Sequence, residues 1–195
     1  MLSHKKSLNI LRKTDALLEG HFVLSSGLHS SKYIQCAKLL SYPHIAEKIC
    51  KSLARKIKKN FSKFDLILSP AMGGIIIGYE IGRILKKETI FCERIKGKFS
   101  LRRGFEIRKG SKVLIIEDVI TTGKSSIECA KLIKKAKAKL VGFASIIDRS
   151  NKRNLKIKKK IISHLKIDVP VFNKNKIPDS LKLIPIKTPG SRFAK

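Results

Sequence analysis

The stretch Val113-Leu114-Ile115-Ile116-Glu117-Asp118-Val119-Ile120-Thr121-Thr122-Gly123-Lys124-Ser125-Ser126 decides the interpretation of this chain. Its first four residues are apolar, which is typical of a strand buried in a parallel sheet. Two acids follow where that strand is expected to end, and hydroxyl residues and a glycine then lead into a helical pattern. Because a helix N-terminus offers free N–H groups and a positive dipole end, residues 121–125 are expected to bind a phosphate.

The adjacent acids Glu117 and Asp118 suit a sugar phosphate that binds beside that loop. Their carboxylates can accept hydrogen bonds from ribose hydroxyls or hold hydrated Mg²⁺. The plainer alternative is an ordinary strand-to-helix turn with two solvated acids. Strand, acidic pair and hydroxyl/glycine turn occur in register, and this combination favours the phosphate site.

Strands and helices alternate along the rest of the chain. Patterning predicts strands at 22–24, 32–36, 66–69, 90–92, 113–116 and 141–147, and helices at 7–18, 44–59, 74–85 and 125–137. The first helix is expected to begin at Ser7. The alternation predicts an α/β fold, a central parallel sheet flanked by helices on both faces. Ligands of such sheets gather at the carboxyl ends of the strands.

Length and composition limit the classes of protein that fit. The 195 residues, 43% of them hydrophobic, predict one domain covering residues 1–195. No apolar run approaches the ~20 residues that cross a bilayer, and no signal peptide is evident, so we expect a cytoplasmic protein without membrane association. The scattered cysteines are predicted to be buried reduced thiols rather than a zinc site, and they are Cys36, Cys50, Cys92 and Cys129.

The net charge is unusually positive, with 44 Lys and Arg against 14 Asp and Glu, giving +30. Such a balance often indicates nucleic-acid binding. The densest run, residues 151–166, has seven basic residues and no acid, but it lacks the interleaved aromatics of a single-strand-binding surface. We therefore predict a solvated helix or loop there and consider nucleic acid an unlikely partner. A basic field would also steer anionic substrates.

Three further loops have residues suited to binding anions. Gly73 and Gly74 in the loop 69–75 let the backbone approach an anion. The segment 93–106 has five cationic side chains between glycine-containing bends, which predicts a mobile basic lid over a leaving group. Its flanks, 90–92 and 105–107, are predicted to pair as a hairpin, and the alternative is an exposed hairpin without this role. Arg149 suits a carboxylate or pyrimidine edge, or else a surface salt bridge with Asp148.

Together these segments resemble the orotate phosphoribosyltransferases, members of the type I phosphoribosyltransferase family. Residues 113–126 have the form of that family's phosphoribosyl-pyrophosphate (PRPP) motif, and residues 22–27 and 30–33 resemble its N-terminal segment. The resemblance covers residues 7–171. It implies the type I phosphoribosyltransferase fold, with a core at about 41–170 and a small hood made mainly of residues 1–40 plus the C-terminal segment.

The resemblance also implies an activity. The enzyme would transfer the 5-phosphoribosyl group from PRPP to orotate, giving orotidine 5'-phosphate and pyrophosphate in de novo UMP biosynthesis. It would require Mg²⁺, held by PRPP and water, with Asp118 as a candidate ligand. It would form a homodimer in which each lid reaches into the partner's site.

Residue roles follow from the same resemblance. PRPP would contact Arg94, Met72, Gly73, Glu117, Asp118, Val119, Ile120, Thr121, Thr122, Gly123, Lys124 and Ser125. Orotate would contact Thr121, Arg149, Tyr33 and Ile34. The catalytic residues would be Glu117 and Asp118 with Lys98, Arg102 or Arg103, a choice that the sequence leaves open. The chain departs from many relatives at three places, where Ser25 replaces a lysine, Met72-Gly73 replaces Tyr-Lys, and Ser100 replaces the lid histidine.

Two other functions remain open from the sequence. A phosphoribosyltransferase for a purine or for uracil would keep the PRPP motif and change the hood and Arg149. A PRPP-fold regulator would bind RNA or DNA through the basic surface, with an affinity that falls steeply with salt. We also expect no fused decarboxylase, because a barrel of ~250 residues does not fit beside this domain within the 195 residues.

Overall fold

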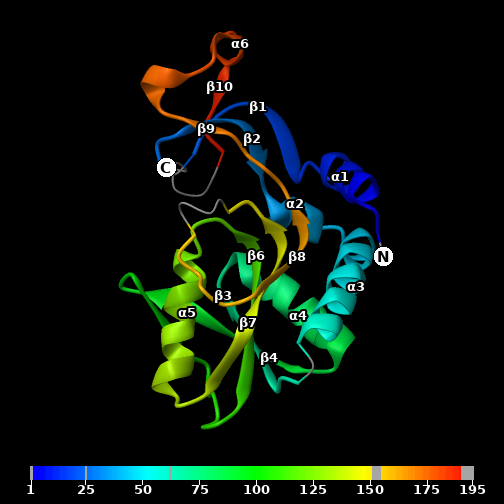
Figure 1. The fold of residues 1–195 in the computed structure, drawn as a ribbon, viewed down its shortest axis with the longest axis vertical. Helices are drawn as coiled ribbons and strands as arrows, with labels where there is room; N and C mark the ends of the chain where they lie inside the picture. Colours follow the sequence, from blue (N-terminus) through cyan, green and yellow to red (C-terminus); the bar gives the residue numbers. More distant parts are fainter. Residues whose placement is uncertain (1, 25, 62, 151–154, 190–195) are drawn as a thin grey trace.

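The computed structural model describes residues 2–24, 26–61, 63–150 and 155–189, which form two sheets (Figure 1). The larger sheet has six strands in the order β5-β4-β3-β6-β7-β8. All its neighbouring strands are parallel except β4 and β5, which are antiparallel. Its strands are β3 (Leu66–Pro70), β4 (Glu88–Ile95), β5 (Lys98–Leu101), β6 (Lys112–Ile120), β7 (Lys139–Asp148) and β8 (Ile161–Lys166).

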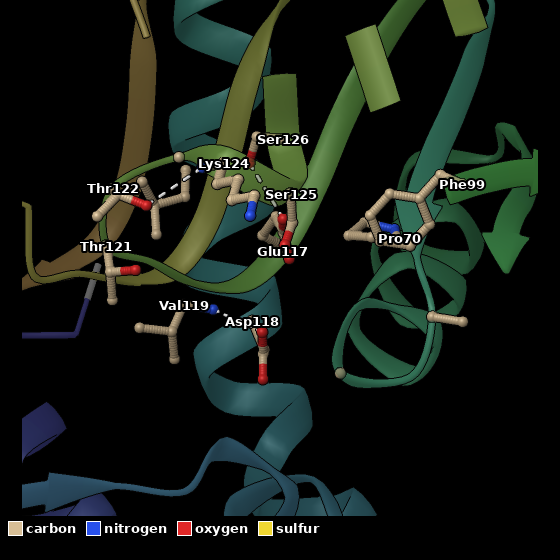
Figure 2. Close-up of a pocket in the computed structure, with 14 residues that line it drawn as sticks. Pro70, Phe99, Glu117, Asp118, Val119, Thr121, Thr122, Lys124, Ser125 and Ser126 are labelled. Carbon is tan, nitrogen blue, oxygen red and sulfur yellow. Dashed lines mark hydrogen bonds between the residues drawn. The ribbon is translucent and has the colours of Figure 1, made fainter. Parts of the chain in front are cut away.

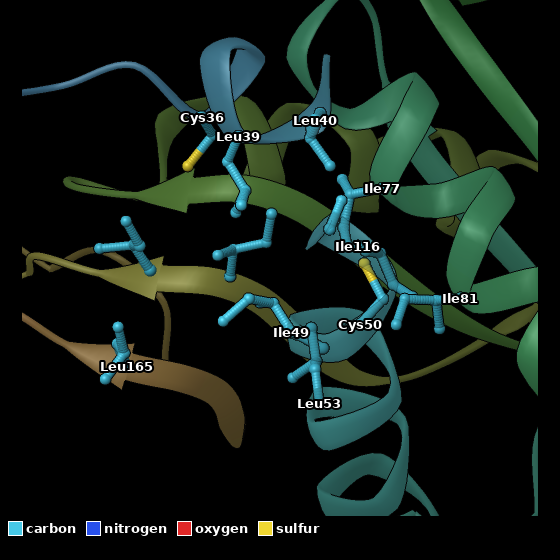
Figure 3. Packing of buried hydrophobic residues seen from close by; sticks show 14 of the residues in the cluster. Cys36, Leu39, Leu40, Ile49, Cys50, Leu53, Ile77, Ile81, Ile116 and Leu165 are labelled. Atoms are coloured by element: carbon cyan, nitrogen blue, oxygen red, sulfur yellow. The ribbon is translucent and has the colours of Figure 1, made fainter. Parts of the chain in front are cut away.

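Helices cover both faces of this sheet (Figure 1). Helices α3 (Pro43–Asn60) and α4 (Gly73–Leu85) lie on one face, and α5 (Lys124–Lys135) lies on the other. Alternate residues of β6 separate the two cores, because successive strand side chains point to opposite faces. Leu114 and Ile116 join the cluster around α3 and α4 (Figure 3), whereas Val113 and Ile115 join the cluster around α5. The predicted parallel sheet between helices is confirmed.

The smaller sheet is built from both ends of the chain, with its strands in the order β10-β1-β2-β9. Leu11, Leu17 and Ile34 from this region join the α3/α4 cluster, so the small sheet and the large one share an apolar core. The elements outside the large sheet are α1 (His4–Lys13), β1 (Leu17–Val23), β2 (His29–Ile34), α2 (Cys36–Leu40), β9 (Val171–Phe172), the 3₁₀ turn η1 (Lys174–Lys176), α6 (Asp179–Lys182) and β10 (Ile186–Lys187).

Three boundaries near the N-terminus differ from the sequence prediction. The strand predicted at 32–36 is β2, which ends at Ile34 because Cys36 begins α2. The helix predicted at 7–18 is α1, which begins after Ser3, whose side chain accepts a hydrogen bond from the N–H of Lys6 at 3.3 Å. It ends before Asp15, which has φ +54°, and Leu17 and Leu18 belong to β1. These leucines fit helical spacing in the sequence, but pairing with β2 determines their conformation.

Three more boundaries differ elsewhere. Strand β6 does not end before the acidic pair but continues to Ile120, because it pairs with β7 as far as Asp148. The hairpin partner of β4 is β5 rather than residues 105–107, because Lys96 and Gly97, at φ +46° and +80°, form a tight turn. Residues 161–166 form strand β8, paired with β7, so the prediction of a helix or loop over 151–166 is wrong there. Residues 151–154 and Ser25 lie outside the described residues.

No helix within the described ranges has the length and apolar character that crossing a bilayer requires.

Candidate active site

A cavity of about 280 Å³ lies where β3 and β6 end, between the N-termini of α4 and α5 (Figure 2). Its lining includes every residue from Glu117 to Ser126, which is most of the predicted motif at residues 113–126. The rest of the lining comes from the loop after β3 and from the β4–β5 hairpin, namely Pro70, Ala71, Gly73 and Phe99. The predicted location of the site at the carboxyl edge of the sheet therefore coincides with a cavity.

The loop before α5 has the geometry of an anion site. Gly123 caps the helix at φ +73°, which side chains with a Cβ rarely adopt, and a Cβ there would lie 2.6 Å from Cγ1 of Ile157. The first turn of α5 has no acidic residue, and its N-cap residue Gly123 provides no side-chain cap, although the N–H of Lys124 donates to Oγ1 of Thr122 at 3.4 Å. The remaining N–H groups and the positive dipole end face the cavity, where they can bind a phosphate.

The acidic pair is divided between the two helices, because neighbouring residues of β6 point to opposite faces. Glu117 points toward α5, and its Oε1 accepts a hydrogen bond of 3.1 Å from Oγ of Ser126. Asp118 points toward α4, where a Cβ on Gly73 would lie 2.5 Å from its Oδ2. One carboxyl group thus stands beside each helix N-terminus.

Both carboxyl groups are held in surroundings that disfavour their charge. Burial raises the pKa of Glu117 to about 8, the nearby charge of Asp118 adds to the rise, and the hydrogen bond from Ser126 opposes it. Burial also raises the pKa of Asp118, against the hydrogen bond that Oδ1 accepts from the N–H of Val119 at 2.8 Å. A ligand that brings hydroxyl donors or a cation would relieve this cost.

The acidic pair also fits Mg²⁺. Carboxylate oxygens are hard ligands of the kind that this ion prefers, and Mg²⁺ commonly binds through one or two carboxylates plus substrate phosphates and water. Within the described part of the chain, no group of three or more His, Cys, Asp or Glu side chains could hold a metal ion. An ion beside Asp118 would therefore complete its coordination with substrate oxygens and water.

The loop between β3 and α4 contributes its backbone to the cavity. Gly73 lines the cavity, whereas the side chain of Met72 is 82% exposed and does not. The Ala71–Met72 peptide bond is cis, and the N–H of Ala71 donates to the carbonyl oxygen of Cys92 at 2.8 Å. Because a Cβ at residue 73 would collide with Asp118, the glycine permits the close approach of this loop to β6.

Of the residues predicted to hold orotate, Thr121 lines the cavity, whereas Tyr33, Ile34 and Arg149 lie outside its lining. Tyr33 is half-buried against Phe22, with ring centroids 5.7 Å apart. Burial raises the pKa of Tyr33, the charge of Arg149 lowers it, and the charge of Asp118 raises it. Arg149 is fixed by its N–H, which donates to the carbonyl oxygen of Ile120 at 2.9 Å, and burial lowers its pKa. Ile34 is only 8% exposed and packs in the core.

The hairpin cations also lie outside the cavity lining. Arg103 is paired with Glu93 at 3.0 Å and lies over the ring of Phe91. Arg94 is paired with Glu128 at 2.7 Å. Lys98 and Arg102 are exposed. The structure thus brings the PRPP-motif residues together around one cavity and leaves the lid cations outside it.

Four lining residues were missed as site residues by the sequence prediction. Pro70 and Ala71 stand in the glycine loop that the sequence did single out, and Ser126 is the last residue of the predicted motif, directly after the last residue that was given a role. Phe99 lies within the predicted lid, where the sequence prediction assigned roles only to cationic side chains, because an anionic leaving group was expected there. The alternation of β5, which places Phe99 opposite Arg94, is the signal that could have identified it.

Comparison with known proteins decides the family. The phosphoribosyl transferase domain family matches residues 39–176. A relative from Erythrobacter litoralis (strain HTCC2594), an orotate phosphoribosyltransferase, is 42% identical over 193 residues, which is 98% of this chain and 99% of that one. This chain belongs to the orotate phosphoribosyltransferase family. The family predicted from the sequence is therefore confirmed.

Solved structures agree on the fold of this orotate phosphoribosyltransferase family member. The orotate phosphoribosyltransferase of Aeropyrum pernix aligns with a TM-score of 0.66 and 21% identity, covering 82% of this chain and 92% of that one. The adenine phosphoribosyltransferase of Thermoanaerobacter pseudethanolicus aligns with a TM-score of 0.60 and 19% identity, covering 70% and 88%. Because enzymes named for different bases share this fold, the fold alone does not identify the base.

Proposed function

We propose that this enzyme transfers the 5-phosphoribosyl group of PRPP to orotate, giving orotidine 5'-phosphate and pyrophosphate in pyrimidine biosynthesis. The observation that carries the proposal is the cavity in which residues 117–126 surround the free N-terminus of α5. A phosphate-binding helix end next to two buried carboxyl groups suits a ribose 5-phosphate. The 42% identity to an orotate phosphoribosyltransferase supports orotate as the base.

In this proposal the 5-phosphate binds the N–H groups of residues 121–125, with the side chains of Thr121, Thr122, Lys124 and Ser125 around it. Gly123 lets the backbone curve around the phosphate, because it holds φ +73°. Val119 and Ile120 form the wall beneath the ribose. Glu117, held by Ser126, accepts hydrogen bonds from the ribose hydroxyls.

The acidic pair would also stabilise the transition state. A ring nitrogen of orotate, bound as an anion that has already lost its proton at that nitrogen, would form a bond to the anomeric carbon as the bond from that carbon to pyrophosphate breaks, and positive charge would develop on the ribose. Once ribose hydroxyls and Mg²⁺ offset the burial that raises their pKa values, Asp118 and Glu117 would place negative charge beside that centre. Bound Mg²⁺ would supply charge neutralisation and a template for the diphosphate oxygens.

Pyrophosphate would leave toward the loop after β3 and the hairpin. Gly73 lines that side of the cavity, and the Asp118 carboxylate stands beside it, so bound Mg²⁺ would be needed to offset the repulsion between Asp118 and pyrophosphate. Lys98, Arg102 or Arg103 would neutralise the leaving charge and exclude water when the hairpin closes. Arg94 could bind pyrophosphate only after it leaves Glu128.

Orotate would bind on the hood side, between Tyr33 and Arg149, next to Thr121. The guanidinium of Arg149 is largely buried, and this burial lowers its pKa. A carboxylate ligand would offset that cost through a planar, bidentate contact. Ile34 supports the hood from within the core rather than touching the ring.

The proposed assembly is a homodimer with shared active sites. Met72, Ile76 and Tyr79 are 82%, 52% and 67% exposed and recur at helical spacing on one side of α4. Such an exposed apolar stripe beside the site favours burial against a second copy. Sedimentation velocity tests this, with dimers expected for the wild type and monomers for Ile76→Glu. A dimeric Ile76→Glu variant would place the interface elsewhere.

The chain is further proposed to act as one domain in the cytoplasm. The small sheet and the large sheet share the α3/α4 cluster, which supports a single folding unit. All four cysteines are free and buried, and Sγ of Cys92 and Sγ of Cys129 share a hydrogen bond at 3.2 Å. Neighbouring thiols that stay reduced suit a reducing compartment.

The deciding experiment follows the absorbance of orotate with purified protein, PRPP and Mg²⁺. Loss of orotate that requires both PRPP and Mg²⁺ is expected, together with pyrophosphate release. Adenine and uracil are the competing bases to offer in parallel. Pyrophosphate release with one of these and none with orotate would overturn the choice of base. Inactivity with every base, together with salt-sensitive binding to RNA or DNA, would favour a regulator.

A further inference from the structure

Phe99 is the residue through which the β4–β5 hairpin lines the cavity. Of the residues in β4, the turn and β5, all of them described, Phe99 alone lines the cavity. In Figure 2 its ring stands beside Pro70, across the cavity from Ser125 and Lys124. The wall opposite the phosphate loop is therefore partly an apolar ring.

Arg94 holds the ring of Phe99 from behind. The two residues are direct partners across the β4–β5 hairpin, so their side chains share one face. The guanidinium carbon of Arg94 lies 4.1 Å from the ring centroid, within range of a cation–π contact. Its Nη1 donates to the carbonyl oxygen of Gly97 at 2.5 Å. The guanidinium is thus occupied within the protein rather than directed into the cavity.

Glu128 joins this pair to the helix that begins at the phosphate loop. Its Oε2 lies 2.7 Å from Nη2 of Arg94, and the two side chains are 23% and 40% exposed. The contact is an ion pair outside hydrogen-bond geometry, and Oε2 has no hydrogen-bond partner within the described residues. Glu128 lies on α5, two residues after Ser126, which lines the cavity. The chain of contacts therefore runs from α5 through Arg94 to Phe99.

We propose that Glu128 and Arg94 are positioning residues that hold Phe99 as an apolar wall over bound PRPP. The inference rests on the proposed function. Phe99 would narrow the side of the cavity that faces the phosphate loop and exclude water there, which strengthens the electrostatic interactions with the bound phosphates. Glu128 would act on PRPP only through Arg94 and Phe99, because it is absent from the cavity lining.

A double-mutant cycle tests the proposal by titration calorimetry of Mg²⁺–PRPP. Phe99→Ala is expected to weaken binding about 10-fold, the scale of lost apolar contact in a pocket. Glu128→Gln is expected to weaken it about 3-fold, the scale of a partly exposed ion pair. In the Phe99→Ala background, Glu128→Gln should have no further effect, because the wall that Glu128 positions is gone.

The control is Glu19→Gln, which breaks the comparable Arg12–Glu19 ion pair of 3.1 Å outside the cavity lining and should leave PRPP binding unchanged. Thermal unfolding checks that each variant is folded. Additive effects would overturn the proposal, since a general loosening of the hairpin does not depend on Phe99. Tighter PRPP binding by Glu128→Gln would also overturn it, because Arg94 would then be a PRPP ligand that Glu128 withholds.

The proposed function can fail separately. A wild-type protein that binds PRPP but consumes no orotate would contradict orotate transfer and leave the binding cycle interpretable. A wild-type protein that binds no PRPP would overturn both.

Discussion

The phosphate loop and the β4–β5 hairpin approach the same cavity but are organised by different forces. The loop is fixed by its own backbone, through the strand β6, the left-handed Gly123 and the start of α5. The hairpin beyond the pairing of β4 with β3 is held by side chains, since Arg94 is bound to Glu128 of α5 and Arg103 is bound to Glu93 within the hairpin. The loop is thus ready for an anion, whereas two hairpin cations are already paired.

This difference shows what each region would do when PRPP binds. Backbone N–H groups at a helix end need no rearrangement to bind a phosphate. The hairpin cations reach the cavity only if the hairpin moves or a partner subunit supplies them. The phosphate loop would therefore bind phosphate without moving, whereas the hairpin on the opposite side of the cavity would neutralise charge only after it moves or through the partner subunit.

The largest expected effect comes from the fixed side. Asp118→Asn should lower kcat about 10²–10³-fold, the usual loss for a group that stabilises transition-state charge. The fold should survive because the asparagine oxygen can still accept the hydrogen bond from Val119. Asp65→Asn is the matched control, since Asp65 accepts a hydrogen bond from the N–H of Lys112 at the other end of β6. Wild-type turnover in Asp118→Asn would sink the role of the acidic pair.

A smaller loss is expected when the backbone of the loop is strained. Gly123→Ala forces a Cβ to within 2.6 Å of Ile157 at φ +73°, and the strain should cost about 1–3 kcal/mol. We expect kcat/KM for PRPP to fall about 10- to 100-fold, because the misplaced N–H groups bind phosphate poorly. Gly110→Ala is the control, with φ +81° and open space around its Cβ. Equal losses of activity in both variants would mean that strain, not the loop, is responsible.

The hairpin side should respond less and through the partner subunit. Arg102→Ala should lower kcat about 10-fold, and Arg103→Ala should lower it less because Arg103 is engaged with Glu93. Mixing Arg102→Ala with Asp118→Asn should restore about a quarter of wild-type activity if lids act across a symmetric dimer. Each mixed dimer then has one site with intact acids and an intact lid. Activity that does not rise on mixing would place the lid and the acids of each site in one chain.

The phosphate loop could be predicted from the sequence better than the β4–β5 hairpin, for a physical reason. An apolar run, two acids and Gly123 specify their conformation locally, and the two acids and Gly123 line the cavity that follows the buried run. The lid prediction counted charges, but ion pairs formed in three dimensions decide where Arg94 and Arg103 lie. Pairing likewise overrode local pattern at Leu17 and Leu18, which join β1. The tie between Glu128 and Phe99 links distant segments and could not be foreseen from spacing.

Acid should destabilise the fold at a residue outside the cavity lining. Activity measured in acid would then report unfolding as well as the difference between the phosphate loop and the hairpin. His164 is 5% exposed, and its Nε2 lies 2.8 Å from Oγ of Ser7. Burial lowers the pKa of His164 to about 4, and the charges of Lys56 and His4 add to the fall. The unfolded chain, with a histidine pKa of about 6.5, binds more protons between these values. Stability should therefore fall as pH drops from about 6.5 to about 4, by an amount on the order of 3 kcal/mol.

Urea unfolding across this pH range measures the effect, with His164→Gln expected to flatten the slope and exposed His44→Gln expected to keep it. A slope unchanged in His164→Gln would assign the acid sensitivity to other groups. Suppose that His164→Gln does flatten the dependence of the unfolding free energy on pH. A loss of activity in acid that the wild type shows and His164→Gln does not is then caused by unfolding. A loss of activity in acid that both proteins show is caused by groups in the active site. Only that shared loss bears on the difference between the phosphate loop and the hairpin, because His164 joins β8 to α1 and lines no part of the cavity.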